Sequence, residues 1–479
     1  MPKFENTQLF GGWGRSPLSE ASPMRSDEDA HAKMDDITKF IASAPNGAKI
    51  LARGLGRSYG DAASCAGGYL SAREDFLDIF EFDPVNEELR ASSGFSLDEI
   101  MRRLIPKGYF VHVTPGTRYV TLGGAIAADI HGKNHHKDGS FINHVKNFEL
   151  ITANSRLKVT PADPLFWATA GGMGMTGIIT EATIRLKKIQ TAYIKVTTQR
   201  TSNVSETIEK MQNLDDSYTY SVAWVDSLAS GNSLGRSVIT WGEHADEDEL
   251  EPKLANHPLA YDPNIRLKAP DLAPGWLLNR TSIRVFNEAW YRKSPKDRVL
   301  FESIPSYFHP LDSVSDWNRL YGKTGFLQYQ FQVPFGQEDT LISIIHKFSK
   351  NRTPSFLSVL KRFGPGSSGH LSFPQPGWTL ALDIPIRTAG LSELLDGIDF
   401  QVAEAGGRVY FAKDSRLIPE LVPMMYPRLD EWRGVVEQYD PDGIFISDLG
   451  RRLSLRNSLK IKANLVETLG AEIGKGPNL

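Results

Sequence analysis

The sequence has one cysteine, no long apolar run and no block of basic residues, and each absence narrows the interpretation. A single cysteine, Cys65, excludes an intramolecular disulfide and a cysteine-based metal site. We expect Cys65 to be a small buried residue rather than a reactive thiol. No apolar run is long enough to span a bilayer, and the N-terminus lacks the apolar core of a signal peptide. These absences predict a cytoplasmic protein with at most a peripheral membrane contact; a periplasmic face reached with a partner stays an open alternative.

The charge is nearly balanced, which argues against a polyanionic partner. The 479 residues include 54 Lys or Arg and 57 Asp or Glu, for a net charge of −3. There is no basic stripe interleaved with aromatic residues, so we expect no nucleic-acid surface. The length allows two or three domains with ample core.

The most informative stretch is ARGLGRSYGDA, residues 52–62, which follows a short apolar strand expected at 48–51. Gly54, Gly56 and Gly60 permit tight backbone conformations and close approach to a ligand. Successive backbone N–H groups in such a turn can bind one anion, such as a pyrophosphate. Arg53 and Arg57 add positive charge there. Taken alone, the stretch fits an ordinary tight turn equally well.

Two further stretches, at 114–145 and 163–180, also place glycines and small residues beside apolar runs. Each predicts backbone passing close to something large and flat. Three such stretches so near one another suit one extended ligand better than three unrelated turns.

Together these stretches carry a family resemblance. RGLGRSYGD, PGTRYVTLGGAIAADIHGKNHH and LFWATAGGMGMTGIIT resemble the vanillyl-alcohol-oxidase-type FAD enzymes. Within that superfamily, DIHGKNHHKDGSFINHV and GGRVYFAKDSRL resemble the decaprenylphosphoryl-β-D-ribose 2-oxidases, over about residues 10–453. The resemblance implies an α+β fold, with a two-subdomain FAD-binding domain and a substrate or cap domain built on an antiparallel sheet. We expect the FAD-binding domain at 1–190, the cap domain at 191–407, and a C-terminal segment, 408–479, that returns to the FAD-binding domain.

Local patterns predict the main elements. We expect an N-terminal arm at 10–16, a helix at 27–44, a capping box from Ser96 and Glu99, a hairpin at 145–160, and a helix capped by Asp163. The cap domain should hold strands at 193–197, 218–225, 237–241, 326–333, 357–363 and 378–386, with helices at 204–214, 338–349 and 391–405. Residues 251–276, with five prolines, read as one long mobile loop, either a lid or a membrane-docking segment. A strand at 408–413 should return toward the flavin.

The resemblance assigns a set of FAD-binding residues. These are Arg53, Gly54, Leu55, Gly56, Arg57, Ser58, Tyr59, Gly60, Asp61, Gly116, Thr121, Leu122, Gly123, Gly124, Ala128, Asp129, Ile130, His131, Ile179 and Tyr410. Many relatives attach FAD covalently through a histidine at the position of Arg57. We therefore expect FAD to be bound non-covalently here.

The catalytic candidates are Lys413, the first choice, and Tyr410 and His131. A flavin oxidase needs a group to take the substrate hydroxyl proton and a cation to stabilise the reduced flavin. By itself, Lys413 also fits an exposed lysine paired with Asp414. The resemblance places it at the flavin and substrate, with Tyr410 and His131 beside the cofactor.

Substrate binding is expected from two amides on one strand face, Gln328 and Gln330. Amides suit hydroxyl recognition, although an edge strand with solvated glutamines would show the same pattern. The resemblance adds four residues to the substrate pocket: Lys361, Tyr307, Lys133 and Asn134.

Four histidines, His131, His135, His136 and His144, stand close together in the sequence. Their spacing matches no known ligand set and no carboxylate is in phase with them, so we expect no metal.

The resemblance implies FAD-dependent oxidation of the 2-hydroxyl of a polyprenyl-phosphate ribose to the 2-keto sugar. This would be the first half of an epimerisation that makes the arabinose donor for cell-wall arabinan, completed by an NAD(P)H-dependent short-chain reductase. The well-known oxidases of the family carry a cysteine where Ala381 stands here, so the change leaves the exact substrate open. The alternative is an aldonolactone or sugar-alcohol oxidase acting on a soluble sugar. A third class is a flavin-bearing protein without turnover.

Overall fold

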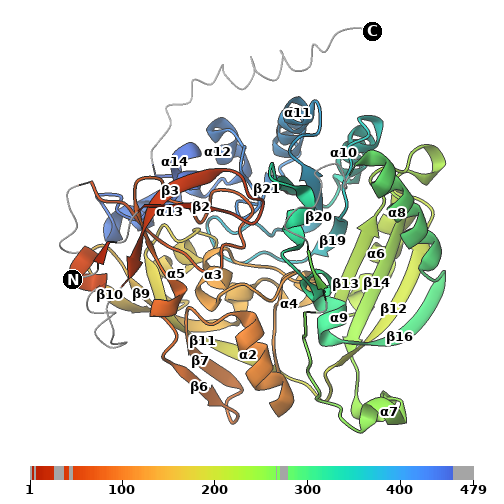
Figure 1. Ribbon diagram of the computed structural model, residues 1–479, viewed down its shortest axis with the longest axis horizontal. Coiled ribbons are helices and arrows are strands. Elements are labelled where there is room, and N and C mark those ends of the chain that lie inside the picture. Colours follow the sequence, from red (N-terminus) through yellow and green to blue (C-terminus); the bar gives the residue numbers. More distant parts are fainter. Residues whose placement is uncertain are drawn as a thin grey trace.

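The computed structural model describes residues 3–4, 7–25, 37–41, 47–265, 267–269 and 279–456. Within these residues the strands form a five-stranded, a six-stranded and an eight-stranded sheet and one two-stranded pair. Figure 1 shows the six-stranded sheet at the lower left and the eight-stranded sheet at the right, with α3 and α4 between them. Among the described residues, no helix combines the length and apolar character needed to cross a membrane.

The five-stranded sheet carries the glycine loop at its edge. β3 (Leu18–Arg25), β5 (Tyr69–Ser71) and β4 (Ile50–Ala52) run parallel in that order, and β1 (Lys3–Phe4) and β2 (Gln8–Gly11) add antiparallel to β3. The predicted N-terminal arm is therefore partly a strand of this sheet. Its next residues bond to the glycine loop, from Trp13 N to Ser58 O at 2.7 Å.

The six-stranded sheet is antiparallel, and four helices lie in the same part of the chain. Its strands are β10 (Arg156–Val159), β9 (Val145–Ile151), β11 (Ile178–Lys188), β7 (Glu88–Ser92), β6 (Phe80–Asp83) and β8 (Tyr109–Val111). The helices are α2 (Leu97–Leu104), α3 (Leu122–Ala127), α4 (His135–Asp138) and α5 (Pro164–Thr169). The predicted hairpin and the capping box of Ser96 and Glu99 are confirmed. Asp163 precedes α5, but its carboxylate accepts hydrogen bonds from Thr160 instead of capping the helix.

The eight-stranded sheet confirms the predicted antiparallel cap architecture. Its order is β16 (Asp297–Ser303), β12 (Tyr193–Thr201), β14 (Ser237–His244), β13 (Tyr220–Val225), β19 (Ser358–Phe363), β20 (Gly377–Pro385), β18 (Phe326–Pro334) and β21 (Arg408–Val409). Apolar faces of α6 (Val204–Leu214), α10 (Glu338–Lys350) and α11 (Leu391–Glu404) pack with these strands in one core. The predicted strand at 408–413 is wrong beyond Val409, because the chain turns there and Lys413 N donates to Tyr410 O.

The segment predicted as one mobile loop is anchored where the structure describes it. It contains α7 (Pro252–Ala255) and β15 (Leu267–Lys268), which pairs with β17 (Val314–Ser315). Ala192 N donates to Pro258 O, and Arg118 donates to Pro263 O. These bonds hold the segment against the six-stranded half. Of the predicted loop, residues 266 and 270–276 lie outside the described residues.

The remaining helices complete the chain: α8 (Arg280–Lys293), α9 (Ile304–Phe308), α12 (Val422–Met425), α13 (Leu429–Tyr439) and α14 (Asp448–Arg452). Most of the predicted helix at 27–44 lies outside the described residues, but 37–41 are helical. The division at 190 and 407 stays a prediction. The sheet changes between β11 and β12, near the first boundary, while β21 keeps 408–409 in the eight-stranded sheet. A bridge between Ile50 and Phe445 ties the C-terminal segment to the five-stranded sheet.

Candidate active site

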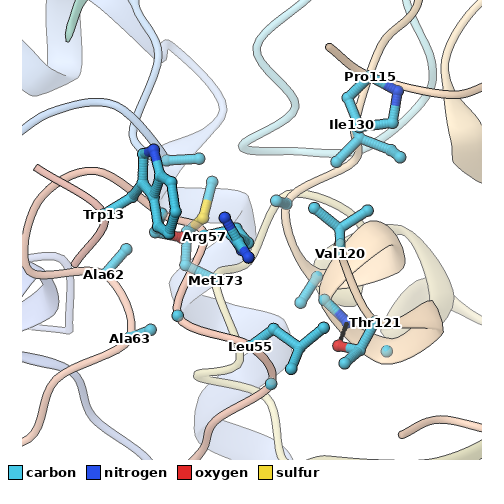
Figure 2. Close-up of a pocket in the computed structure, with 18 of the residues that line it drawn as sticks. Trp13, Leu55, Arg57, Ala62, Ala63, Pro115, Val120, Thr121, Ile130 and Met173 are labelled. Atoms are coloured by element: carbon cyan, nitrogen blue, oxygen red, sulfur yellow. Dashed lines mark hydrogen bonds between the residues drawn. The ribbon is translucent and has the colours of Figure 1, made fainter. Parts of the chain in front are cut away.

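One cavity of about 300 Å³ is lined by residues of the three glycine-containing stretches and of the middle strands of the eight-stranded sheet. Its wall includes the loop 52–59, the N-terminal end of α3 and the turn before β11. Trp13, Arg57 and Met173 lie together on one side of it, opposite Val120 and Thr121 (Figure 2). The cavity is therefore shared between the two halves of the molecule.

The glycine loop offers bare backbone to the cavity. The N–H groups of residues 54–58 donate to no atom within the described part of the chain. Gly56 has a φ of +63°, and a Cβ on Gly54 would lie 2.4 Å from Thr121 Oγ1. Free, adjacent N–H groups in a glycine turn form an anion-binding concavity. This geometry favours the anion-site interpretation over the ordinary turn.

The two arginines of the loop have different roles. Arg53 donates to Ala63 O at 2.6 Å and to Gly11 O at 2.8 Å, so its guanidinium fixes the loop to the N-terminal strands. Arg57 stacks on the Trp13 ring at 3.8 Å, and its Nε is buried without a partner. Burial lowers the pKa of Arg57, while Asp312 opposes the shift. Arg57 therefore offers a ligand its buried Nε–H, which bonds to none of the described residues.

The helix α3 brings its first turn to the cavity. Thr121 caps it by accepting from Gly124 N at 3.2 Å, the bond drawn in Figure 2. A Cβ on Gly123 would come within 3.0 Å of Ser93 Cβ, so glycine allows the helix to pack closely here. The small residues predicted to line a flat ligand thus form one wall.

The opposite wall is made of polar side chains, and strand register brings them together. Gln328 on β18 stands directly across from Asp383 on β20, and Gln330 stands across from Ala381. Residues paired in this way share a face of the sheet. Gln330 Nε2 lies 3.0 Å from His131 Nε2 and donates to Thr379 Oγ1 at 3.2 Å. The predicted amide pair is therefore buried in the cavity wall and not on a solvated edge.

His131 is held as a neutral donor. An amide N–H can only donate, so His131 Nε2 accepts from Gln330 and the ring proton is on Nδ1. That Nδ1 is buried, and within the described residues it has no partner. Burial, then the charge of Lys361, lowers the pKa of His131 well below its ordinary value. One N–H donor of the wall is thus unused by the protein.

Lys413 lies in the cavity wall with its Nζ 3.8 Å from the centre of the Tyr59 ring. Burial lowers the pKa of its ammonium group, the charge of Asp383 opposes that shift, and Lys361 adds to it. Burial also lowers the pKa of Lys361, to about 8. Lys413 is therefore a cavity lysine and not an exposed one paired with Asp414, whose carboxylate binds Arg452.

Asp383 is a functional candidate that the sequence motifs did not indicate. It is fully buried and accepts from Gln328 Nε2 at one oxygen, while the other oxygen has no partner in the described part of the chain. Burial raises the pKa of its carboxyl, and Lys413 opposes that rise. The alternation of β20 could have indicated it, since Ala381 and Asp383 share the face that carries the predicted site.

Twenty of the predicted site residues line the cavity. They are Arg53, Gly54, Leu55, Gly56, Arg57, Ser58, Tyr59, Gly116, Thr121, Gly123, Gly124, Ala128, Ile130, His131, Ile179, Gln328, Gln330, Lys361, Tyr410 and Lys413. Tyr410 donates from its hydroxyl to Ala128 O at 2.9 Å, which ties the cap side to α3. Trp13, Met173 and Ala381 also line it.

Seven predicted residues lie behind the wall, not in it: Gly60, Asp61, Leu122, Asp129, Lys133, Asn134 and Tyr307. Asp61 pairs with Arg452, and Asp129 accepts from Ser140 and Ser367. Lys133 donates to Tyr307 O and lies 3.9 Å from the Tyr307 ring centre. The side chains of Asp61, Asp129, Lys133 and Asn134 are all bonded to protein, so they support the wall from behind.

The histidines that stand together in the sequence are separated in space. His136 Nε2 lies 2.9 Å from Tyr218 O, His135 Nδ1 accepts from Gly364 N, and His144 stacks on His112 at 4.2 Å. In the described ranges, no three His, Cys, Asp or Glu side chains gather as a metal site would require.

Comparison with known proteins identifies the family. Residues 31–160 match the model of the FAD binding domain. The decaprenylphosphoryl-β-D-ribose oxidase of Mycolicibacterium smegmatis is 44% identical over 454 residues, which cover 94% of this chain and 98% of that protein. The chain belongs to the decaprenylphosphoryl-β-D-ribose oxidase family. This confirms the resemblance seen in the sequence motifs, and the protein is an FAD-dependent oxidoreductase.

Two further relatives show how far the similarity extends. An uncharacterized protein of Streptomyces coelicolor is 37% identical over 374 residues, covering 75% of this chain and all of that protein. The delta(24)-sterol reductase homolog of Caenorhabditis elegans is 24% identical over 197 residues, only 39% of this chain. Similarity to the oxidase family thus spans both halves of the fold.

The cavity fits the FAD that the decaprenylphosphoryl-β-D-ribose oxidase family implies. The free N–H groups of residues 54–58 suit a pyrophosphate, and the glycines of α3 leave room beside it. Arg57 Nε, Ser71 Oγ and His131 Nδ1 are buried atoms of cavity-wall residues, and none of them has a partner among the residues that the structure describes. Such orphan donors are rare unless a ligand satisfies them.

Proposed function

We propose that this protein oxidises the 2-hydroxyl of a polyprenyl-phosphate ribose to the 2-keto sugar. The observation that carries the proposal is the meeting of a nucleotide-binding loop with Lys413, Gln328 and Gln330 in one cavity. The 44% identical relative from M. smegmatis, named for a decaprenylphosphoryl ribose, supports this substrate class. FAD, when bound, supplies the two-electron oxidation of a C–OH group.

The chain's own residues would bind the sugar and move its proton. Gln328 and Gln330 are fixed from behind by Asp383, His131 and Thr379, so their amides are held rigidly for hydroxyl recognition. Lys413 Nζ can take up or release a proton near neutral pH, because burial lowers its pKa. The neutral His131 offers its Nδ1–H as a fixed donor. Together they orient one hydroxyl-bearing carbon.

We further propose that FAD is held non-covalently. Arg57 stands in the loop where the resemblance expects the attaching histidine, and it is stacked on Trp13. Denaturing the yellow protein should release free FAD into the filtrate. Flavin that stays with the precipitated chain would contradict this.

The product chemistry implies a partner. A 2-keto sugar becomes the epimeric alcohol only through a hydride donor, so an NAD(P)H-dependent short-chain reductase is proposed as the next enzyme. A peripheral membrane contact is proposed as well, because the substrate carries a prenyl chain. The cytoplasmic location stays a prediction.

An anaerobic titration tests the proposal. Absorbance of oxidised flavin is followed while the purified protein receives a polyprenylphosphoryl ribose, or in parallel a soluble aldonolactone or alditol. Bleaching by the lipid-linked ribose alone is expected. Bleaching by a soluble sugar, with fast reoxidation by oxygen, would instead establish the sugar-alcohol oxidase. If none of these compounds bleaches the flavin, the protein is a flavoprotein without this activity.

A further inference from the structure

Arg452 joins the glycine loop to the turn that carries Lys413. Its Nε and Nη2 donate to the two carboxylate oxygens of Asp61 at 2.9 and 2.8 Å. Nη2 also donates to Asp414 Oδ2 at 2.8 Å. Asp61 lies at the end of the glycine-containing stretch, and Asp414 follows Lys413 directly. Both carboxylates are buried, so water screens their attraction to the guanidinium only weakly.

The loop and the turn also meet through their backbones. Tyr59 N donates to Ala412 O at 2.9 Å. A Cβ on Gly60 would overlap Asp414 O, so the two segments are in direct contact there. Next to this contact, Lys413 Nζ lies 3.8 Å from the centre of the Tyr59 ring. A side chain is held in place only as well as the backbone that carries it, so the position of Lys413 depends on how the turn sits against the loop.

Arg452 projects from a helix that is itself anchored. Ser447 caps α14, and Asp448 accepts from Ser19 Oγ of β3 at 2.6 Å. Arg452 Nη1 donates to Leu417 O at 2.9 Å, just after the turn. All three guanidinium nitrogens are therefore bonded to the loop or to the chain around the turn. We call this set of bonds the Arg452 bridge.

We propose that Arg452 is a positioning residue that fixes Lys413 against the cofactor loop. Arg452 does not line the cavity, so it acts on the chemistry only through Asp61 and Asp414. A lysine cannot replace it, because one ammonium group lacks the planar fork that reaches both carboxylates at once. The inference rests on the proposed function for the reaction that Lys413 serves, while the Arg452 bridge itself needs no substrate.

Arg452→Lys tests the proposal, since it keeps the positive charge and loses the fork. The FAD-loaded variant should stay yellow, and a saturating polyprenylphosphoryl ribose should reduce it about 10–100-fold more slowly, because a small misplacement of a reacting group costs rate. The half-saturating concentration should change by less than about threefold, since Gln328 and Gln330 are untouched. A wild-type rate at saturation would overturn the proposal. So would loss of FAD, because Arg452 would then serve the cofactor loop alone.

A second readout follows Lys413 without turnover. Amine labelling of the FAD-loaded protein over a series of pH values, measured by mass spectrometry of the peptide that holds Lys413, gives the midpoint of its titration. In the parent protein burial lowers the pKa of Lys413, the charge of Asp383 opposes that shift, and Lys361 adds to it. Water should reach the ammonium once the turn is loosened, so the midpoint in Arg452→Lys should rise by about one pH unit. An unmoved midpoint would contradict the positioning role.

A matched control separates positioning from general stability. Arg236 also donates to two carboxylates, through Nε and Nη2 to Asp226 and through Nη2 to Glu288, and it does not line the cavity. Arg236→Lys removes this similar bridge far from Lys413 in the chain. Flavin reduction and the Lys413 midpoint should both keep their wild-type values. If Arg236→Lys changes them as much as Arg452→Lys does, the effect is one of stability and the proposal fails.

Double variants show whether Arg452 acts through Lys413. In a Lys413→Ala background, Arg452→Lys should slow flavin reduction by less than about threefold, because the group that it positions is already absent. Effects that multiply in full would overturn the proposal. If Arg452→Lys does not fold, Asp61→Asn breaks the Arg452 bridge from the loop side and should give the same loss of rate and the same rise in midpoint.

The labelling experiment also separates this inference from the proposed function. If the phosphoryl ribose does not reduce the wild-type flavin, the proposed function fails, and the midpoint of Lys413 in Arg452→Lys still decides whether the Arg452 bridge positions it. If the wild-type flavin is reduced but Arg452→Lys matches it in rate and midpoint, the proposed function stands and the positioning role is refuted.

Discussion

The two walls of the cavity are built in different ways. The loop at 54–58 and the start of α3 present backbone N–H groups and glycines, with few side chains. The opposite wall presents Gln328 and Gln330 of β18 and Lys361 of β19, beside Lys413 in the turn after β21. The first wall is suited to bind a ligand through its shape and its free N–H groups. The second is suited to bind through positioned polar and charged side chains. Cofactor binding and chemistry should therefore be separable by mutation.

The largest expected effect is at the backbone wall. Gly54→Val places a branched side chain where a Cβ alone would lie 2.4 Å from Thr121 Oγ1. We expect a folded protein that has lost more than about tenfold in FAD affinity and purifies colourless. The ratio of flavin to protein absorbance measures this. Gly434→Ala, in α13 with open space around it, is the control and should stay yellow. A yellow Gly54→Val protein would refute the role given to the loop.

The next effect is at the side-chain wall. Lys413→Ala should leave FAD bound but slow flavin reduction by substrate about 10²–10⁴-fold, since it removes the cavity's proton-exchanging group. Anaerobic stopped-flow absorbance measures the rate. Lys350→Ala, at an exposed lysine of α10, should reduce normally. Unchanged reduction in Lys413→Ala would remove it from the mechanism.

The pH dependence of flavin reduction tests the electrostatic effect of Asp383 on Lys413. The negative charge of Asp383 raises the pKa of Lys413, against the lowering by burial. Asp383→Asn removes that charge, so the limb of the flavin-reduction profile that reports Lys413 should move to lower pH, by about one unit. Bound FAD should be unchanged. An exposed carboxylate variant, Asp339→Asn, should leave the profile in place. If the Asp383→Asn profile does not move, Asp383 is only structural.

Trp13 tests the contribution of the N-terminal strands to the backbone wall. Trp13→Ala removes the ring 3.8 Å from Arg57 and its edge contact with Trp317 at 5.8 Å. We expect FAD to bind about tenfold more weakly, in line with the loss of one cation–π stack. Fluorescence titration of the apoprotein with FAD measures it. Leu9→Ala, on the exposed part of β2, should bind FAD normally.

The smallest expected effect is at Ala381. Ala381→Cys adds one atom at a cavity-lining position, so flavin reduction should change by less than about threefold. The new thiol should react with a maleimide, and bound substrate should protect it. The native Cys65 is buried and should not react in the parent protein. Rapid labelling of the parent would contradict this placement.

Much of the backbone wall, and the glutamine pair of the side-chain wall, could be predicted from the sequence. Three features depend on local backbone geometry: the glycine loop after a strand, the small residues of α3, and the spacing of Gln328 and Gln330 on one strand. A short stretch of sequence is enough to predict each of them. The same holds for the capping box of Ser96, which the structure confirms.

Which buried side chains contact one another was determined by the tertiary structure alone. The β18–β20 register sets Asp383 beside Gln328, 55 residues away in the chain. Arg53 bonds to Gly11 O and Ala63 O, and Lys133 and Tyr307 lie behind the cavity. No local pattern specifies these positions, because they depend on which strands pair and how the two halves pack. The sequence thus determined the family, the cofactor class and the shape of the loop, while the packing of distant segments determined which buried charges face the chemistry.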